Sequence, residues 1–112
     1  MDEITFHDFL KVNIQVGRIV RAEPSAKAKK PAYKLWIDFG DLGIKASSAQ
    51  VTALYQLEDL IGRLVGAVTN FPPKQVADLV SEVLVLGVPV DGTEEVVLIG
   101  PDRDVPVGSR IG

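Results

Sequence analysis

The side chains best placed by the sequence to bind a ligand are amides, hydroxyls and ammonium groups. The segment Asn70-Phe71-Pro72-Pro73-Lys74 sets an amide and an ammonium on either side of two prolines, and Ser81 follows soon after. Each proline fixes its own φ, and the residue before a proline is pushed into extended backbone. We therefore predict a stiff loop that holds Asn70 and Lys74 outward. The alternative interpretation is that the prolines merely end a strand.

The sequence holds no combination of residues typical of catalysis. His7 is the one histidine, cysteine is absent, and Ser47 and Ser48 have no base close to them in sequence. A glycine-rich phosphate loop and a histidine and carboxylate cluster with metal-ligand spacing are both missing. We therefore expect no enzyme activity, no catalytic residue, no metal and no cofactor.

Residues 33–39 predict a strand with a second set of binding residues. Polar and apolar residues alternate here, which places Lys34, Trp36 and Asp38 on the face opposite the apolar residues. An exposed tryptophan beside a lysine can stack on a nucleobase while the ammonium contacts phosphates. It can also anchor a subunit interface, and the acidic Asp38 on the same face favours that second role.

Length and composition predict one globular domain over residues 1–112, because a chain that is 46% hydrophobic can bury a single core. Acidic residues stand at the N-terminus where a signal peptide would be basic, and no apolar run is long enough to cross a bilayer. We expect a cytoplasmic protein that does not insert into membranes.

The net charge of -3 is unevenly distributed along the chain. Residues 1–56 carry eight bases and six acids, whereas residues 57–112 carry four bases and nine acids. The first half could therefore supply a basic face for a polyphosphate. Lys27, Lys29 and Lys30 fit such a face, and they fit a solvated loop equally well.

Apolar residues recur mostly at every second position, which predicts strands over 12–21, 33–39, 44–47, 64–69, 83–90 and 95–99. Gly17 is expected to mark a bend or bulge in the first of them. Thr5 is predicted to cap a helix over 6–10, and a second short helix is predicted over 48–55. This order describes an all-β fold, the five-stranded OB-fold Greek-key barrel. An SH3-like barrel fits the strand count but lacks the helix between the third and fourth strands.

Five ordered motifs resemble the CsaA family, and the likeness continues through Pro101-Asp102 and Val105-Pro106-Val107-Gly108. The motifs are residues 9–17 (FLKVNIQVG), 34–40 (KLWIDFG), 47–51 (SSAQV), 70–74 (NFPPK) and 81–87 (SEVLVLG). That family belongs to the tRNA-binding group of OB-folds and is similar to the C-terminal domain of bacterial methionyl-tRNA synthetase. The resemblance implies a cytoplasmic homodimer, described both as a tRNA-binding protein and as a secretion-related chaperone.

Carried onto this chain, the resemblance implies an RNA-binding face at Lys34, Asn70, Lys74 and Ser81. Two departures reduce its charge. Asn13-Ile14-Gln15 stands where the family usually has Asp-Ile-Arg, and Val80 stands where the family usually has a basic residue. Each lost contact removes about one counterion from the salt-dependent affinity, so we expect modest RNA binding.

A homodimer also follows from the residues, because 64–68 and 83–90 are apolar on both faces and a small barrel buries only one. The residues predicted at the interface are Phe6, Phe9, Leu10, Trp36, Val105 and Ile111. Two functions remain open. The first is non-enzymatic tRNA binding through a basic and polar barrel face, and the alternative is a chaperone that holds unfolded export precursor proteins in an apolar groove.

Overall fold

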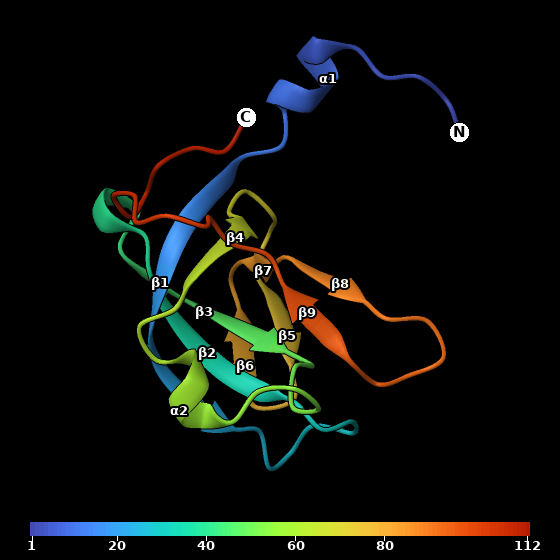
Figure 1. The fold of residues 1–112 in the computed structure, drawn as a ribbon, viewed down its shortest axis with the longest axis vertical. Helices are drawn as coiled ribbons and strands as arrows, with labels where there is room; N and C mark the ends of the chain where they lie inside the picture. The colour runs from blue at the N-terminus through green and yellow to red at the C-terminus, as the bar shows by residue number, and fades with distance from the viewer.

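A computed structural model describes residues 1–112, and its centre is a curved antiparallel sheet with the strand order β3-β2-β1-β4-β7 (Figure 1). The backbone N–H groups of Glu82 and Val83 donate to the Ala46 carbonyl of β3, at 2.8 and 3.4 Å, and bring the two edges of the sheet together. The result is a nearly closed five-stranded barrel, so the predicted OB-fold is confirmed. The strands are β1 (Ile14–Pro24), β2 (Tyr33–Asp38), β3 (Ile44–Ala49), β4 (Leu64–Val68) and β7 (Leu84–Val85).

The core lies inside the barrel and is built from every second residue of its strands. In β2, Leu35 and Ile37 are completely buried, while the side chains between them are only partly covered. The alternation predicted for 33–39 is therefore confirmed, and it leaves Lys34 and Trp36 on the outer face. Burial of such apolar side chains is the main stabilising contribution to the fold.

A bend or bulge was predicted at Gly17, but Gly17 pairs regularly with Val65, so no bulge lies at this residue. The register between β1 and β2 shifts later, between Ile19 and Arg21. A Cβ on Gly17 would lie 2.5 Å from Cγ2 of Ile37, which explains the glycine by close packing. Gly17 therefore interrupts the alternation in β1 because Ile37 packs closely against it, and not because the strand bulges there.

Of the two predicted helices, one is confirmed and one is misplaced. Helix α1 (Phe6–Leu10) begins at Thr5, whose side chain accepts from the Asp8 N–H at 3.1 Å. The segment 48–55 is not helical, because β3 continues to Ala49 opposite Tyr33. The second helix, α2 (Leu57–Leu60), begins later, and a 3-10 turn, η1 (Gly40–Leu42), joins β2 to β3.

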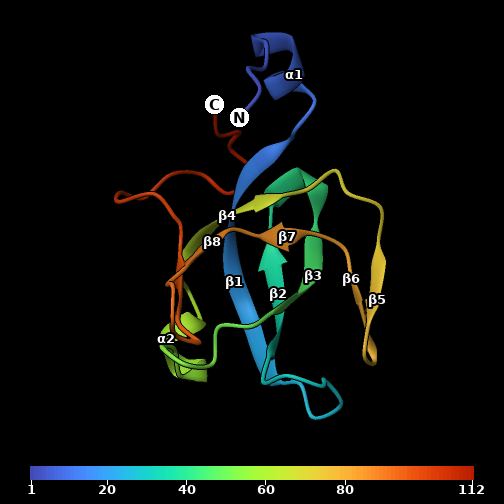
Figure 2. The same ribbon diagram turned by 90° about the vertical axis from the view of Figure 1, so that its right-hand side faces the viewer.

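Two small hairpins extend the barrel (Figures 1 and 2). One consists of β5 (Lys74–Val76) and β6 (Leu79–Ser81) and lies beside β3. The other consists of β8 (Gly87–Pro89) and β9 (Val96–Leu98). The predicted strand 83–90 is thus divided, because β7 pairs with β4 whereas β8 pairs with β9. No helix of the structure combines the length and the apolar character that a membrane span requires.

Strand β4 is enclosed by its own chain, which corrects part of the argument for a dimer. Residues 65–68 are all buried. The Gly66 N–H donates to the Ile99 carbonyl at 2.9 Å, and a Cβ on Gly66 would lie 3.1 Å from Cδ1 of Ile111. The segment 64–68 therefore leaves no spare apolar surface. Exposed apolar residues remain in 84–99, on and beside the second hairpin.

Candidate nucleic-acid interface

Three of the four predicted RNA-binding residues lie in one row across neighbouring strands. Lys34 of β2 is directly opposite Ser48 of β3. The Ser48 N–H donates to Oγ of Ser81 at 3.1 Å, and Ser81 is opposite Lys74 in the β5–β6 hairpin. Neighbouring strands are about 4.8 Å apart, so this row spans about 14 Å from Lys34 to Lys74. Ser81 is the last residue of β6, before the predicted strand 83–90.

The two lysines of this row differ in their electrostatic surroundings. The Lys34 ammonium lies 2.8 Å from a carboxylate oxygen of Asp78, and only 17% of its side chain is exposed. Lys74 is exposed and forms no ion pair. The hydrogen bond from Lys34 holds the pKa of Asp78 below its ordinary value, so that carboxylate is charged at neutral pH. Lys74 is free to contact a phosphate, whereas Lys34 already has an anionic partner.

Asn70 lies outside this row and has structural partners. Its side-chain carbonyl accepts from the Asn13 N–H at 2.9 Å, and its amide donates to the Lys11 carbonyl at 2.7 Å. Both contacts tie the proline loop to the start of β1. The side chain of Gln15 is also occupied, because it donates to the Gly108 carbonyl and accepts from Thr69. The amide of Asn70 is therefore committed to folding contacts within the chain.

A pocket of about 310 Å³ opens beside the row. Ser48, Ser81 and Lys74 line one part of it, and Phe71 and Leu84 add apolar surface that is 54% and 48% exposed. An exposed aromatic ring beside an ammonium is the arrangement on which single-stranded nucleic acids stack. Phe71 is a candidate contact that the sequence prediction does not include, although its position between Asn70 and Pro72 places it in the predicted loop.

The basic loop after β1 lies on the same side of the barrel. Lys27, Lys29 and Lys30 line a hollow of about 400 Å³ together with Ser48 and the hairpin residue Ala77. No acidic residue lines this hollow. Lys29 and Lys30 also line a second hollow, which contains Glu94 and Glu95. Both interpretations of these lysines, a basic face and a solvated loop, therefore stay predictions.

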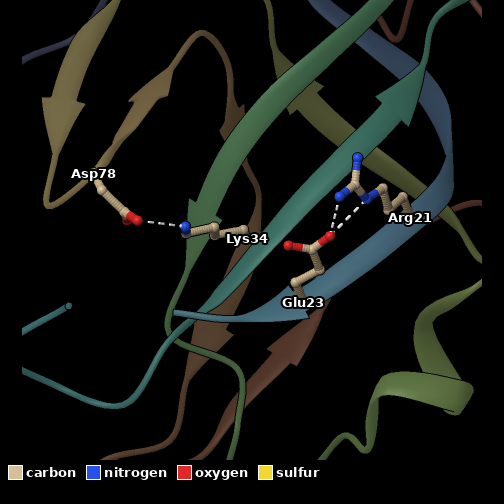
Figure 3. A network of polar contacts seen from close by, with 4 residues as sticks. All are labelled: Arg21, Glu23, Lys34 and Asp78. Carbon is tan, nitrogen blue, oxygen red and sulfur yellow. Dashed lines mark hydrogen bonds and ion pairs between the residues drawn. The ribbon is translucent and has the colours of Figure 1, made fainter. Parts of the chain in front are cut away.

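Trp36 lies on the outer face of β2 with Arg21 over its ring, 4.4 Å from the ring centroid. The Arg21 guanidinium also donates to a carboxylate oxygen of Glu23, as Figure 3 shows. One face of the indole is therefore covered by a residue of the same chain. A cation over an aromatic face contributes about 0.5–1 kcal/mol at an exposed site.

The six predicted interface residues do not form one patch. Phe6 and Phe9 pack together in α1 with ring centroids 6.2 Å apart, and the Ile111 N–H donates to Ile14 at the start of β1. Trp36 is opposite Arg21. Arg21 lies seven residues beyond Ile14 in β1, which is about 23 Å at about 3.3 Å per residue. The Arg110 guanidinium donates to the Leu10 carbonyl of α1 at 3.0 Å, and Figure 1 shows α1 and the C-terminal segment at one end of the molecule. Val105 lies elsewhere, beside Arg18 and Asp38.

Residues 14–110 match the protein family described as "Putative tRNA binding domain". The fold is similar to the crystal structure of chaperone CsaA from Bacillus anthracis, with 48% sequence identity, a TM-score of 0.92 and coverage of 99% of this chain and 100% of that chain. It is also similar to the CsaA chaperone protein of Picrophilus torridus, with 48% identity, a TM-score of 0.89 and coverage of 98% and 100%.

The sequence is similar to part of a methionine–tRNA ligase from Methanococcus aeolicus. The identity is 37% over 111 residues, which cover 99% of this chain but only 16% of the ligase. The chain therefore corresponds to a small portion of these curated relatives.

Proposed function

The chain belongs to the tRNA-binding domain family, and on that premise we propose that it is a non-enzymatic tRNA-binding protein. The face that we propose for RNA is the row of Lys34, Ser48, Ser81 and Lys74, extended by the basic loop. The observation that carries the proposal is the alignment of two ammonium groups and two hydroxyls across four neighbouring strands. Such groups contact phosphates and position RNA without reading its sequence.

Phe71 extends this proposal beyond phosphate contacts. Its exposed ring borders the same pocket as Lys74 and Ser81. Stacking of a base on an aromatic side chain contributes about 1–3 kcal/mol and tolerates any base. We therefore expect binding to several tRNAs, with unpaired nucleotides placed near Phe71. Binding of tRNA would also agree with the cytoplasmic location expected from the sequence.

The test is binding of purified protein to total tRNA over a salt series. Lys74→Ala should weaken binding to different tRNAs alike, since phosphate contacts carry no sequence information. The matched control is Arg103→Ala, which removes one positive charge from the exposed loop near the C-terminus. Equal affinities of both variants and the wild-type protein would remove Lys74 from the proposed face.

We propose a homodimer as the working form. Phe6 of α1 is 72% exposed, and Val88 and Val97 form an exposed cross-strand pair in the β8–β9 hairpin. Exposed apolar groups of this kind are characteristic of subunit interfaces. Two copies related by symmetry would present two RNA faces to one folded tRNA. Sedimentation at micromolar concentration tests this, and a monomer would contradict it.

Chaperone activity is the second candidate function. The pocket of about 310 Å³ has Phe71 and Leu84 in its lining, which suits an apolar side chain of an extended polypeptide. The solved CsaA structures similar to this chain are described as chaperones. Apolar contacts are nearly independent of salt, whereas phosphate contacts weaken steeply as salt rises. Salt-tolerant binding of an unfolded export precursor would support this function, and salt-sensitive binding of tRNA alone would support the first.

A further inference from the structure

The turn of the β5–β6 hairpin places a carboxylate against the proposed RNA face. Asp78 follows Ala77 at this turn, and its carboxylate reaches across to Lys34 of β2 (Figure 3). The oxygen to nitrogen distance is 2.8 Å, and the two side chains are 33% and 17% exposed. This pair joins a hairpin outside the barrel to a strand of the barrel sheet.

Two lysines, Lys34 and Lys27, act on the Asp78 carboxylate. Besides Lys34, the ammonium of Lys27 is close enough to help lower the pKa of Asp78. Lys29 and Lys30 line the hollow that borders Ala77, and they also line a second hollow with Glu94 and Glu95. A carboxylate oxygen accepts the same charge-assisted hydrogen bonds as a phosphate oxygen. Asp78 therefore occupies a position in which the surrounding lysines would also hold a phosphate.

The hairpin that carries Asp78 is anchored to β3 through Ser81, whose Oγ accepts from the Ser48 N–H at 3.1 Å, whereas its turn lies outside the barrel sheet. Its two strands pair over only three residues each. Ala77 has a φ of +53°, which is an unfavourable backbone conformation for any residue except glycine. A hydrogen bond of 2.8 Å from the Gln75 amide to the Ala77 carbonyl supports the turn from within the same hairpin. The turn at Ala77 and Asp78 pairs with no strand of the barrel, so Asp78 can leave Lys34 without breaking the contacts of β6.

Glu23, which is directly opposite Lys34 in β1, does not replace Asp78 as its partner. The Glu23 carboxylate accepts from Arg21 at 2.7 Å instead. Lys34 therefore depends on the hairpin for its counter-charge, and displacement of Asp78 would expose an unpaired ammonium beside Ser48.

We propose that Asp78 is an electrostatic latch, which neutralises Lys34 in the free protein and is displaced by an RNA phosphate on binding. The proposal rests on the proposed tRNA-binding function. The latch lowers affinity for every polyanion, because each phosphate that reaches Lys34 must first break the pair with Asp78. Only ligands with several phosphates, bound also by Lys74 and the basic loop, gain enough contacts to open it.

The test compares Asp78→Asn with the wild-type protein in binding to total tRNA and to inorganic polyphosphate. Asp78→Asn should bind both about three- to tenfold more tightly at low salt, with a similar salt slope, because Lys34 contacts a phosphate in both complexes. The matched control is Asp104→Asn, because Asp104 forms a similar pair with Arg18, at 3.1 Å, and the net charge changes equally. That control should show no comparable gain.

Two further variants identify the cause. In Lys34→Ala the additional change Asp78→Asn should give no gain, since the lysine that the latch controls is absent. Ala77→Gly relaxes the turn and keeps the carboxylate, so it should leave affinity below that of Asp78→Asn. An equal gain in Ala77→Gly, or a gain that persists without Lys34, would overturn the latch. So would an unchanged affinity of Asp78→Asn for both probes.

The two probes separate this proposal from the proposed function. If the wild-type protein and Asp78→Asn both fail to bind tRNA, the tRNA-binding function is wrong. The latch is then judged by polyphosphate, for which Asp78→Asn must still bind more tightly than the wild-type protein and than Asp104→Asn. Thermal unfolding of each variant verifies that the fold is retained.

Discussion

The two hairpins outside the barrel differ in length and in surface chemistry. Two residues join β5 to β6, whereas six residues, among them Asp91, Glu94 and Glu95, join β8 to β9. The β5–β6 hairpin carries the exposed Lys74 and the paired Asp78 beside the basic loop. The β8–β9 hairpin carries Val88 opposite Val97, with 51% and 43% of these residues exposed. The same backbone unit thus presents charge on one part of the surface and apolar groups on another. In the proposed function, the first hairpin would contact a polyanion and the second an apolar partner.

Salt distinguishes these two surfaces. Exposed charges are screened over about 8 Å at physiological ionic strength, and phosphate binding weakens as counterions compete. Apolar burial contributes about 25 cal/mol per Å² and is not weakened by moderate salt. Substitutions on the β5–β6 hairpin should therefore change RNA binding and leave self-association intact, and substitutions on the β8–β9 hairpin should do the reverse.

The largest expected effect is that of Val97→Glu on self-association. A charge buried at an interface without a partner costs about 3–5 kcal/mol, which raises the dissociation constant of the dimer by at least about 100-fold. Sedimentation across protein concentrations measures this constant. Val20→Glu is the matched control, since Val20 is also 43% exposed but lies in the β1 bulge. Equal effects of both substitutions would remove the β8–β9 hairpin from the interface.

Trp36→Ala is expected to reduce the free energy of unfolding by about 2 kcal/mol, from lost apolar burial and the lost contact with Arg21. The affinity of the folded protein for tRNA should change less than twofold, because Arg21 already covers one face of the ring. Chemical denaturation and tRNA titration measure the two quantities. Unchanged stability with lost tRNA binding would show that the indole stacks on a base instead.

Lys74→Ala should weaken tRNA binding more than Lys34→Ala, although the sequence gives both lysines the same predicted role. Lys74 has no anionic partner to lose, whereas Lys34 must first leave Asp78. We expect a loss of about three- to tenfold for Lys74→Ala at low salt and about half that factor for Lys34→Ala. Filter binding or fluorescence titration measures the affinities. Neither change should alter the dimer, and the reverse order would argue against a neutralised Lys34.

Local patterns explain which parts of the structure were predictable. The Thr5 cap of α1 and the alternation of β2 depend on neighbouring residues, and both are confirmed. The end of β3 was missed because pairing with β2 extends the strand through Ser48 and Ala49. The β5–β6 hairpin was missed because its short strands lack an apolar alternation. In these cases contacts between distant segments override local preference.

The candidate site was predicted residue by residue, but its interactions were not. Lys34, Lys74 and Ser81 do share one row. Asn70 is committed to contacts with the start of β1, a pairing between segments 57 residues apart. Asp78 is 44 residues from Lys34, and no spacing rule relates them. The contact between Asp78 and Lys34 depends on how the β5–β6 hairpin lies beside β3. The local sequence pattern does not determine that placement.

The smallest expected effect is the pH dependence of the stability that the ion pair between Lys34 and Asp78 contributes. The pKa of Asp78 lies below its ordinary value of 3.8 in the folded protein, mainly because Lys34 donates a hydrogen bond to its charged form. A depressed pKa means that the pair stabilises the folded state above the unfolded pKa and loses this effect as pH falls through the folded pKa. The stability difference between the wild-type protein and Asp78→Asn should therefore be constant near neutral pH and should shrink below about pH 3.8.

Thermal unfolding between about pH 2 and about pH 7 measures this difference. Lys34→Ala should lose the same pH-dependent contribution, because Asp78 then lacks its main partner. Asp104→Asn leaves the Lys34 pair intact and should retain that contribution. The apolar variant Val97→Glu should also retain it, since the β8–β9 hairpin takes no part in the pair. A difference that grows as the pH falls would contradict the sign expected for Asp78, and with it the charged contact on which the latch depends.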